Sequence, residues 1–202
     1  MRTITKELQD NINPAQALQL LREGNNRFVN NLKFNRNLLQ QVNETMEGQH
    51  PFAVILSCID SRTSAELIFD QGLGDIFSIR IAGNILNEDI LGSMEFACKV
   101  AGAKIVMVVG HTKCGAIKGA CDHVVMGNLT ALLHKIKPVM DTTPFTNGTV
   151  YAYPNAVAVN NVRYVMDQIL QRSPILSDMV DKGEVIISGG MYEVETGVVD
   201  FL

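Results

Sequence analysis

The sequence contains no uninterrupted apolar run long enough to cross a membrane. A transmembrane helix needs about 18 to 20 consecutive apolar residues, and no stretch of this chain approaches that length. The first ten residues also lack the apolar centre and the small-residue cleavage site of a secretory signal. We therefore expect a cytoplasmic protein with no membrane partner. The sequence leaves open whether a targeting peptide was removed before residue 1.

An excess of charge of either sign is also missing. The 17 basic and 21 acidic residues leave a formal net charge of −4. Proteins that bind nucleic acid or anionic membranes usually carry a basic patch and a clear positive excess. We therefore expect no nucleic-acid partner.

Tryptophan is absent, and cysteine occurs at only four positions, Cys58, Cys98, Cys114 and Cys121. A chain of 202 residues, 47% of them hydrophobic, can bury a core without disulfide bonds. We therefore expect all four cysteines to be reduced. Cys98 falls on the apolar side of an expected helix and is assigned to the core. Cys121 and His123 are two residues apart, so on a helix they would not face the same metal ion.

From residue 52 onward, short apolar runs alternate with helical patterns. Continuous apolar runs are typical of strands that are buried on both faces of a parallel sheet. The βαβα order predicts the α/β class, with a central four-stranded, mostly parallel sheet, an added edge strand and flanking helices. Strands are expected at 52–56, 76–81, 105–109 and 185–190 and near the C-terminus, and helices at 64–70, 88–101, 115–124, 128–141, 155–172 and from 173.

Residues 1–50 are expected to form an N-terminal helical arm and residues 51–202 the α/β core of a single domain. Asn13 can cap a helix whose first position is Pro14. The second half of the arm is polar, with isolated apolar side chains. That pattern suits a segment that lies across a surface, either of its own subunit or of a neighbour. The isolated apolar residues are Leu32, Phe34, Leu38, Leu39, Val42 and Met46.

Three possible metal ligands follow two of the apolar runs. The stretch from Ser57 to Arg62, which contains Cys58, comes directly after the run at 52–56, and His111 and Cys114 follow the run at 105–109. Ligands of open α/β sheets bind beyond the carboxyl ends of the strands, where these side chains would meet. Two sulfurs and one imidazole can hold a zinc ion and leave its fourth position open, as catalytic zinc sites do. The alternative is that the three are unrelated buried residues.

Asp60 and Arg62 place two charges beside this expected metal. A carboxylate there can bind the metal or accept a hydrogen bond from zinc-bound hydroxide, and a guanidinium can hold the carboxylate off the metal through two hydrogen bonds. The alternative is a surface turn with an incidental ion pair. A phosphatase-type loop is disfavoured, because the three residues between Cys58 and Arg62 are too few to surround a phosphate and none is glycine.

Six short motifs occur in order along the chain. They are Cys58-Ile59-Asp60-Ser61-Arg62, Leu67-Ile68-Phe69-Asp70-Gln71, Gly74-Asp75-Ile76-Phe77, Arg80-Ile81-Ala82-Gly83-Asn84, Gly92-Ser93-Met94-Glu95-Phe96 and Gly110-His111-Thr112-Lys113-Cys114-Gly115. With these motifs, and with the ending from Tyr192 to Gly197, the chain resembles the β-class carbonic anhydrase family from about Asn13 to Leu202. The resemblance implies reversible hydration of carbon dioxide to bicarbonate and a proton by zinc-bound hydroxide, with one Zn²⁺ per subunit.

The resemblance also implies a role for each residue of the expected metal site. Cys58, His111 and Cys114 would bind zinc. Asp60 would accept the hydrogen bond of the hydroxide, and Arg62 would hold Asp60 in place. Zinc lowers the pKa of a bound water to about 7, which fits this chemistry.

A substrate pocket of Gln49, Phe77, Ala82, Gly83 and Phe96 is implied in the same way. Plant-type members usually have tyrosine where this chain has Phe96, so one hydroxyl of the pocket is missing. Members whose site closes under the control of bicarbonate carry a tryptophan near the position of Gln49. This chain has no tryptophan, so we expect an open site in which Arg62 keeps Asp60 off the metal.

The resemblance further implies a homodimer as the smallest unit, with the arm crossing to the partner and Gln49 serving the neighbour's zinc. Dimers of the family often pair into a dimer of dimers, and the sequence does not choose between the two states. Two other functions remain open. One is a hydrolase of CS2 or COS on the same scaffold, and the other is a non-catalytic module stabilised by zinc. The second is disfavoured because purely structural zinc sites usually have four protein ligands.

Overall fold

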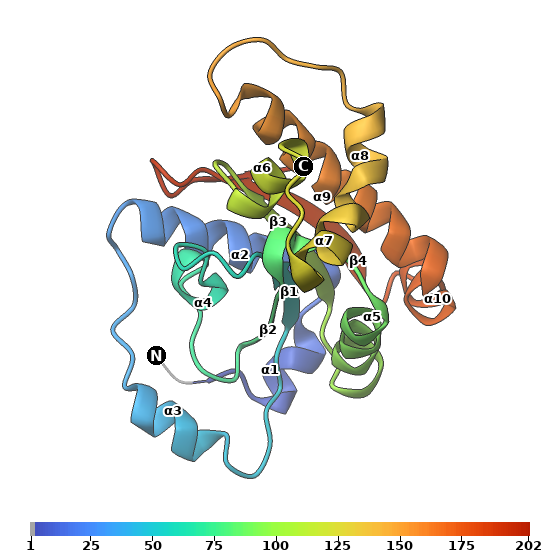
Figure 1. Cartoon of the computed structure of the whole chain (residues 1–202). Coiled ribbons are helices and arrows are strands. Elements are labelled where there is room, and N and C mark those ends of the chain that lie inside the picture. Colours follow the sequence, from blue (N-terminus) through green and yellow to red (C-terminus); the bar gives the residue numbers. More distant parts are fainter. Residues whose placement is uncertain (1–2) are drawn as a thin grey trace.

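A five-stranded sheet forms the centre of the computed structural model, which describes residues 3–202; the first two residues of the expected arm lie outside this range. The strand order is β2-β1-β3-β4-β5 (Figure 1). The first four strands are parallel to their neighbours, and β5 pairs antiparallel with β4. The predicted α/β class, with four parallel strands and an added edge strand, is therefore confirmed. The strands are β1 (Ala53–Ser57), β2 (Ile76–Arg80), β3 (Ile105–His111), β4 (Ile186–Tyr192) and β5 (Val199–Phe201).

The two central strands, β1 and β3, are buried along their whole length. Both faces of these strands are covered, so their sequences contain apolar residues without a polar alternation. The edge strand β2 is instead buried only at Ile76 and then alternates between half-buried and exposed positions. Strand β3 runs two residues beyond the expected apolar run and pairs His111 with Tyr192 of β4. His111 is thus held in the sheet itself rather than in a loop.

Helices cover both faces of the sheet, and three of them precede the first strand in the sequence. The N-terminal helices are α1 (Lys6–Asn11), α2 (Pro14–Val29) and α3 (Leu38–Glu44). The others are α4 (Ala65–Ile68), η1 (Ala82–Asn84), α5 (Glu88–Glu95), η2 (Phe96–Val100), α6 (Gly115–Cys121), α7 (Gly127–Leu133), η3 (His134–Ile136), α8 (Lys137–Thr142), α9 (Ala152–Arg172) and α10 (Pro174–Asp181). As predicted, Asn13 caps α2 and Pro14 occupies its first position.

Three of these helices differ from their expected form. The helix expected at 88–101 is regular only to Glu95 and continues as the π-helical turn η2. The helix expected at 128–141 is interrupted by the 3-10 turn η3. Helix α9 begins at Ala152, three residues earlier than expected, and Pro154 lies in its first turn. Proline is tolerated there because backbone N–H groups of a first turn have no partner within the helix.

Alternate side chains of each central strand enter two separate hydrophobic clusters. Ala53 and Ile55 of β1 belong to the cluster that also contains Leu21 of α2. Val54 and Leu56 of the same strand belong to the other cluster, which includes side chains of α5, α6, α9 and α10. The sheet is therefore a middle layer between α2 with α4 on one face and α5, α6, α9 and α10 on the other, as Figure 1 shows.

Helix α9 lies unusually close to β3 and β4. A Cβ atom at Gly110 would lie 2.7 Å from Cγ2 of Val162, and one at Gly189 would lie 2.7 Å from Cγ1 of the same residue. Real Cβ contacts are not this short, so both strand positions require glycine for the helix to pack as it does. This close packing places α9 against the carboxyl ends of the strands.

Buried polar contacts fix the N-terminal arm to the core. Gln9 Nε2 of α1 donates a hydrogen bond to the carbonyl of Pro51 (2.8 Å), and the buried Asp70 pairs with both Arg27 and Arg36.

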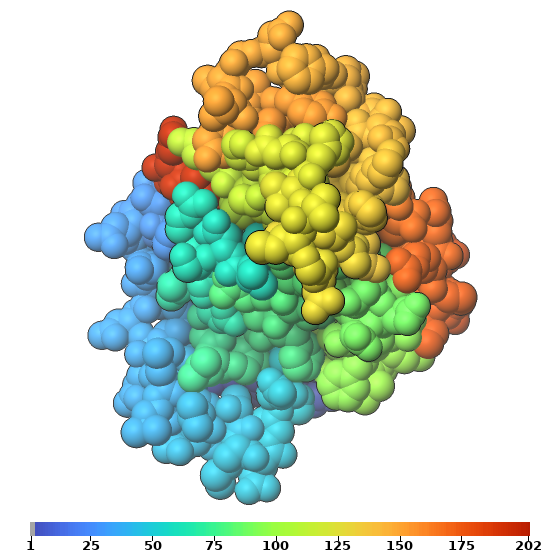
Figure 2. Space-filling view, in the orientation of Figure 1, coloured from blue at the N-terminus to red at the C-terminus, as the bar shows by residue number. Residues whose placement is uncertain are grey.

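Beyond α2 the arm turns away from the sheet, and it forms the blue lower-left part of the surface in Figure 2. Its apolar side chains are exposed in this chain, namely Leu32, Phe34, Leu38, Leu39, Val42 and Met46. None of the helices within residues 3–202 has the length and apolar character needed to cross a membrane.

Candidate metal centre

Three buried side chains meet at the carboxyl end of the central strands. Cys58 directly follows β1, His111 is the last residue of β3, and Cys114 is the N-cap of α6. Their exposed fractions are 4%, 1% and 2%. One donor atom from each lies within 4.8 Å of the other two. Among residues 3–202, no other group of three histidine, cysteine or acidic side chains meets in this way.

The imidazole of His111 has one nitrogen in use and one without a partner. Nδ1 lies 2.9 Å from the carbonyl oxygen of Thr112, which can only accept a hydrogen bond. Nδ1 therefore carries the proton, and Nε2 keeps its lone pair. Nε2 is buried and has no hydrogen-bond partner. A buried acceptor without a partner is costly, and binding a metal ion would satisfy it, with Nδ1 oriented by a backbone carbonyl as in known metal sites.

The two thiols influence each other's ionisation. Their Sγ atoms are 3.9 Å apart, and the backbone N–H of Gly83 points at Cys58 Sγ (3.4 Å). The hydrogen bond from Cys114 lowers the pKa of Cys58, and the Cys58 sulfur in turn raises the pKa of Cys114. The pair of thiols thus loses its first proton easily, and the second proton is held more tightly. A cation bound between the sulfurs would favour loss of both, so this pair suits a metal such as zinc.

Asp60 and Arg62 form a two-fold hydrogen-bonded ion pair beside the cluster. Arg62 Nε donates to Asp60 Oδ1 (2.9 Å) and Nη2 donates to Oδ2 (2.8 Å), while the backbone N–H of Arg62 also donates to Oδ1 (3.0 Å). These bonds, above all those from the guanidinium, hold the pKa of Asp60 well below its usual range. Asp60 is therefore an ionised carboxylate, and Arg62 occupies both of its oxygens.

Two further side chains anchor the turn that carries Cys58 and Asp60. Arg80 Nε donates to the carbonyl of Cys58 (3.0 Å), and its Nη2 donates to that of Asp60 (2.5 Å). The hydroxyl of Thr63 lies within hydrogen-bond distance of the same two carbonyls (3.0 and 2.9 Å). Sequence reasoning did not assign either residue to the site. The pairing of β1 with β2 could have indicated Arg80, because this residue ends β2 beside Ser57, the last residue of β1.

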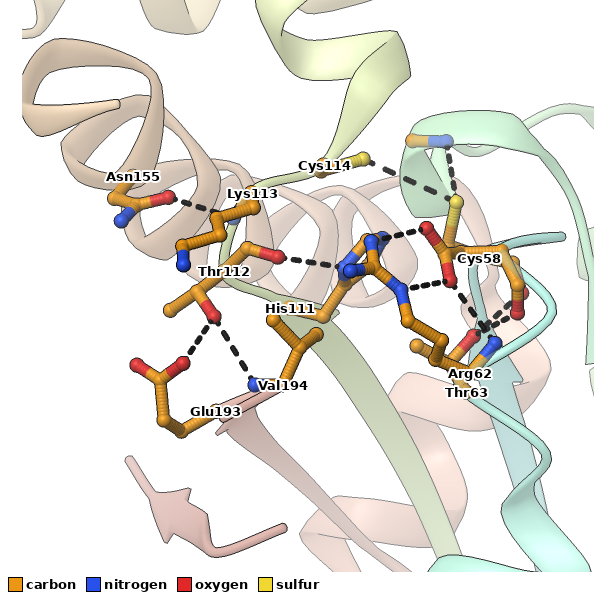
Figure 3. A network of polar contacts seen from close by, with 12 residues as sticks. Cys58, Arg62, Thr63, His111, Thr112, Lys113, Cys114, Asn155, Glu193 and Val194 are labelled. Carbon is orange, nitrogen blue, oxygen red and sulfur yellow. Dashed lines mark hydrogen bonds and ion pairs between the residues drawn. The ribbon is translucent and has the colours of Figure 1, made fainter. Parts of the chain in front are cut away.

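The turn that joins His111 to Cys114 is held from the end of β4. The hydroxyl of Thr112 donates to Glu193 Oε1 (2.7 Å) and accepts a hydrogen bond from the backbone N–H of Val194 (3.2 Å). Figure 3 shows these contacts on one side of His111, with Cys58 and Arg62 on the other. The chain segment after β4 thus supports the metal cluster, which local sequence patterns did not reveal.

The five expected pocket residues do not meet within one chain. Gly83 contacts Cys58 through its N–H, and Ala82 precedes it in η1. Phe77 pairs with Val54 of β1. It lies three residues before the carboxyl end of β2, which is about 10 Å along the strand. Gln49 is exposed and precedes β1, at the end of that strand opposite to Cys58.

Phe77 and Phe96 instead contact each other in an open groove along the β2 edge. Their ring centroids are 6.3 Å apart, and the rings meet edge to face at 66°. The groove encloses about 680 Å³ between β2 and α5, and no residue of the metal cluster lines it. Both rings therefore lie away from the metal cluster of their own chain.

Comparisons with known proteins agree on one family. The family model described as "Carbonic anhydrase" matches residues 53–199. The chain is 32% identical to "Carbonic anhydrase 2" of Mycobacterium tuberculosis over 192 residues, which are 93% of this chain and 92% of the relative. Among solved structures, the β-carbonic anhydrase CcaA matches with a TM-score of 0.71 and 27% identity, covering 93% of this chain and 96% of that one. The β-carbonic anhydrase CafA of Aspergillus fumigatus matches with a TM-score of 0.71 and 25% identity, covering 81% of each chain.

Proposed function

We propose that this chain, which belongs to the β-class carbonic anhydrase family, hydrates carbon dioxide to bicarbonate and a proton with one zinc ion bound by Cys58, His111 and Cys114. Hydration of carbon dioxide is the general activity of the family, so the proposal concerns the metal, the residues and the mechanism. The donor set supports zinc, because two thiolates and one imidazole form a soft three-ligand site that leaves one position open.

One observation carries the proposal. A buried His111 Nε2 without a hydrogen-bond partner faces a pair of thiols that readily loses its first proton. Such a cluster is unfavourable when empty and is completed by a divalent cation. A bound zinc ion would lower the pKa of a water in its open position to about 7 and so supply a nucleophile at neutral pH.

Asp60 orients the nucleophile in this mechanism. The hydrogen bonds from Arg62 keep its carboxylate ionised. An ionised carboxylate can accept a hydrogen bond from the nucleophile but cannot donate one. With a metal bound, the hydrogen bond to Asp60 would leave the nucleophile's free lone pair available for the carbon of CO2. Arg62 holds Asp60 by two parallel bonds and keeps it from binding the metal, so we propose an open site. Ala82, beside Gly83 in η1, lines the apolar side of the substrate position.

A second copy of this chain is proposed to complete the pocket. Gln49, Phe77 and Phe96 are implied to contact substrate, yet none lies at the metal cluster of its own chain. The uncovered groove at the β2 edge and the exposed apolar side chains of the arm offer a surface for the partner. We therefore propose a homodimer, or a dimer of dimers, in which Gln49 serves the neighbouring zinc.

Sedimentation equilibrium tests this assembly. The expected mass is at least twice the 22.2 kDa of the chain at micromolar concentration. A fully active protein that sediments as a monomer would rule out a pocket shared between copies.

A reducing compartment, such as the cytoplasm, is proposed as the location. Zinc binding by Cys58 and Cys114 requires both sulfurs as thiolates, and a 3.9 Å sulfur pair would be open to oxidation elsewhere. Cell fractionation with an antibody tests the proposal, and recovery from an oxidising compartment would contradict it.

Stopped-flow measurement of CO2 hydration, together with the zinc content of the same sample, tests the proposed function. We expect about one zinc per chain and rapid hydration at pH 8. Hydrolysis of COS and CS2 is measured alongside. One zinc per chain without hydration would indicate a non-catalytic module, and COS turnover far above CO2 hydration would indicate a hydrolase.

A further inference from the structure

Helix α9 reaches the metal cluster with two asparagine side chains. Asn155 and Asn161 are six residues apart, which corresponds to about 9 Å along the helix axis. One contacts the turn between His111 and Cys114, and the other contacts the loop that lies over Cys58. These two loops follow different strands, so α9 is one rigid element in contact with both halves of the site.

Asn155 supports the turn between His111 and Cys114. Lys113, inside this turn, has a left-handed backbone with φ of 56°. Its N–H donates to Asn155 Oδ1 at 2.9 Å, as Figure 3 shows. A non-glycine residue in this conformation is strained and persists only when its surroundings hold it. Asn155 supplies one such contact.

Asn161 supports the loop over Cys58. The side chain is only 1% exposed, and its Nδ2 donates to the carbonyl of Gly83 at 3.0 Å. Gly83 has φ of 68°, and a Cβ there would lie 3.1 Å from Ile136 Cδ1. Glycine alone fits this position without strain, but it also leaves the backbone free to rotate. The bond from Asn161 removes that freedom.

The N–H of the same Gly83 donates to Cys58 Sγ at 3.4 Å. Fixing the carbonyl of Gly83 thus fixes the direction of a hydrogen bond to a metal-binding sulfur. Such a bond withdraws electron density from a thiolate and aims its remaining lone pair at the metal, since second-shell partners orient ligands.

We propose that Asn161 is a positioning residue of the metal centre, which keeps the Gly83 N–H on the Cys58 sulfur, and that Asn155 does the same for the Lys113 turn. Helix α9 thereby holds the turn between His111 and Cys114 and the Gly83 loop, which hydrogen-bonds Cys58, at the spacing that one ion requires. This inference rests on the proposed zinc site.

Zinc release to a chromogenic chelator tests the role of Asn161. Starting from the zinc-loaded protein, Asn161→Ala is expected to release zinc about 10 to 100 times faster than the unsubstituted protein, the range typical for loss of a second-shell partner. In the cobalt-substituted protein, the sulfur-to-cobalt charge-transfer band is expected to move to lower energy, because a thiolate that accepts one hydrogen bond fewer is a stronger electron donor. A structural role in folding alone would not shift this band.

Asn160→Ala is the matched control on the same helix. Asn160 Nδ2 donates to Thr143 Oγ1 at 3.0 Å, and its Oδ1 accepts a hydrogen bond from Arg163 Nη1 at 3.3 Å. This change therefore also removes hydrogen bonds of α9, but away from the metal. Zinc release and the cobalt band are expected to match those of the unsubstituted protein.

Asn155 provides a second test that does not depend on a fully buried position. Asn155→Ala is expected to speed zinc release, and Asn155→Asp, which keeps an acceptor oxygen for Lys113 N–H, is expected to restore slow release. Unchanged zinc release and an unchanged cobalt band in folded Asn161→Ala would overturn the inference for Asn161. Equal release from the two Asn155 variants would overturn it for Asn155. A protein that binds no zinc before substitution would instead refute the proposed function.

Discussion

Asp60→Asn is expected to lower kcat for CO2 hydration by about 100-fold or more while zinc stays bound. Asparagine keeps the size of the side chain but replaces one acceptor oxygen with an NH2 group that faces the donors of Arg62. The substitution removes the hydrogen bonds by which Arg62 orients the side chain, and it removes the negatively charged acceptor for the nucleophile. Positioned proton-acceptor groups typically increase the reaction rate 10²- to 10⁴-fold. Stopped-flow kinetics and zinc analysis of the same preparation measure the two effects separately.

Asp122→Asn is the matched control for this substitution. Asp122 lies on the surface at the C-cap of α6 and pairs with Lys118 one turn earlier. The chemical change is the same, but an exposed pair of this kind contributes only a few tenths of a kcal/mol. Its hydration rate is expected to be unchanged. Normal kinetics in zinc-loaded Asp60→Asn would remove Asp60 from the mechanism, and loss of zinc would reassign it to metal retention.

The pH dependence of the unsubstituted enzyme follows from the same ion pair. Because Arg62 holds the pKa of Asp60 far below its usual range, Asp60 keeps its charge throughout the range in which the enzyme is assayed. We therefore expect hydration activity to rise with pH as the nucleophile ionises, with no step from Asp60; a pH profile of kcat measures this.

The central sheet could be predicted from the sequence because its strands are defined by local pattern. The apolar runs at 52–56 and 105–109 have no polar alternation, and a parallel sheet covered on both faces is the usual home for such runs. The same pattern indicated a possible metal cluster, and the resemblance to the family decided between this cluster and three unrelated buried residues. Cys58, His111 and Cys114 come at strand ends that a parallel sheet brings to one edge.

Contacts between distant segments could not be predicted in this way. Asn161 looks like an ordinary polar position of an amphipathic helix, and only the close packing of α9 on β3 and β4 turns it toward Gly83. Gln49 lies only nine residues before Cys58 in the sequence, yet the two residues do not meet within this chain. Strand β1 lies between them and carries the two residues to opposite ends. Direction along a strand, rather than distance in sequence, decides which side chains meet.

Cys114→Ser is expected to remove zinc and, with it, both hydration activity and the stabilisation that zinc provides. The buried cluster loses one of its two sulfurs, and a serine hydroxyl is a poor zinc ligand. A metal present at about 1,000 times its Kd stabilises the folded state by about 4 kcal/mol. Urea unfolding with and without added zinc is expected to show this difference for the unsubstituted protein and none for Cys114→Ser.

Acidification is expected to have the same effect as the substitution. Zinc binds the thiolate forms of Cys58 and Cys114, and the pKa of Cys114 is raised by its neighbour, so protons compete with the metal for the cluster. The zinc-dependent part of the free energy of unfolding is therefore present at neutral and alkaline pH and is lost as the pH falls. Urea unfolding at pH 5 and pH 8, each with and without zinc, measures how the zinc-dependent free energy of unfolding changes with pH.

Cys121→Ser separates the metal site from cysteine chemistry in general. Cys121 ends the same helix, α6, that Cys114 caps, but it is half-buried and lies outside the cluster. We expect this variant to keep its zinc, its hydration activity and its zinc-dependent stability. If Cys114→Ser retained zinc as tightly as Cys121→Ser, two ligands would suffice and the three-residue site would be wrong. If both variants lost zinc, the loss would reflect a disturbed α6, and the cluster would need to be tested through His111→Ala, where β3 rather than α6 carries the ligand.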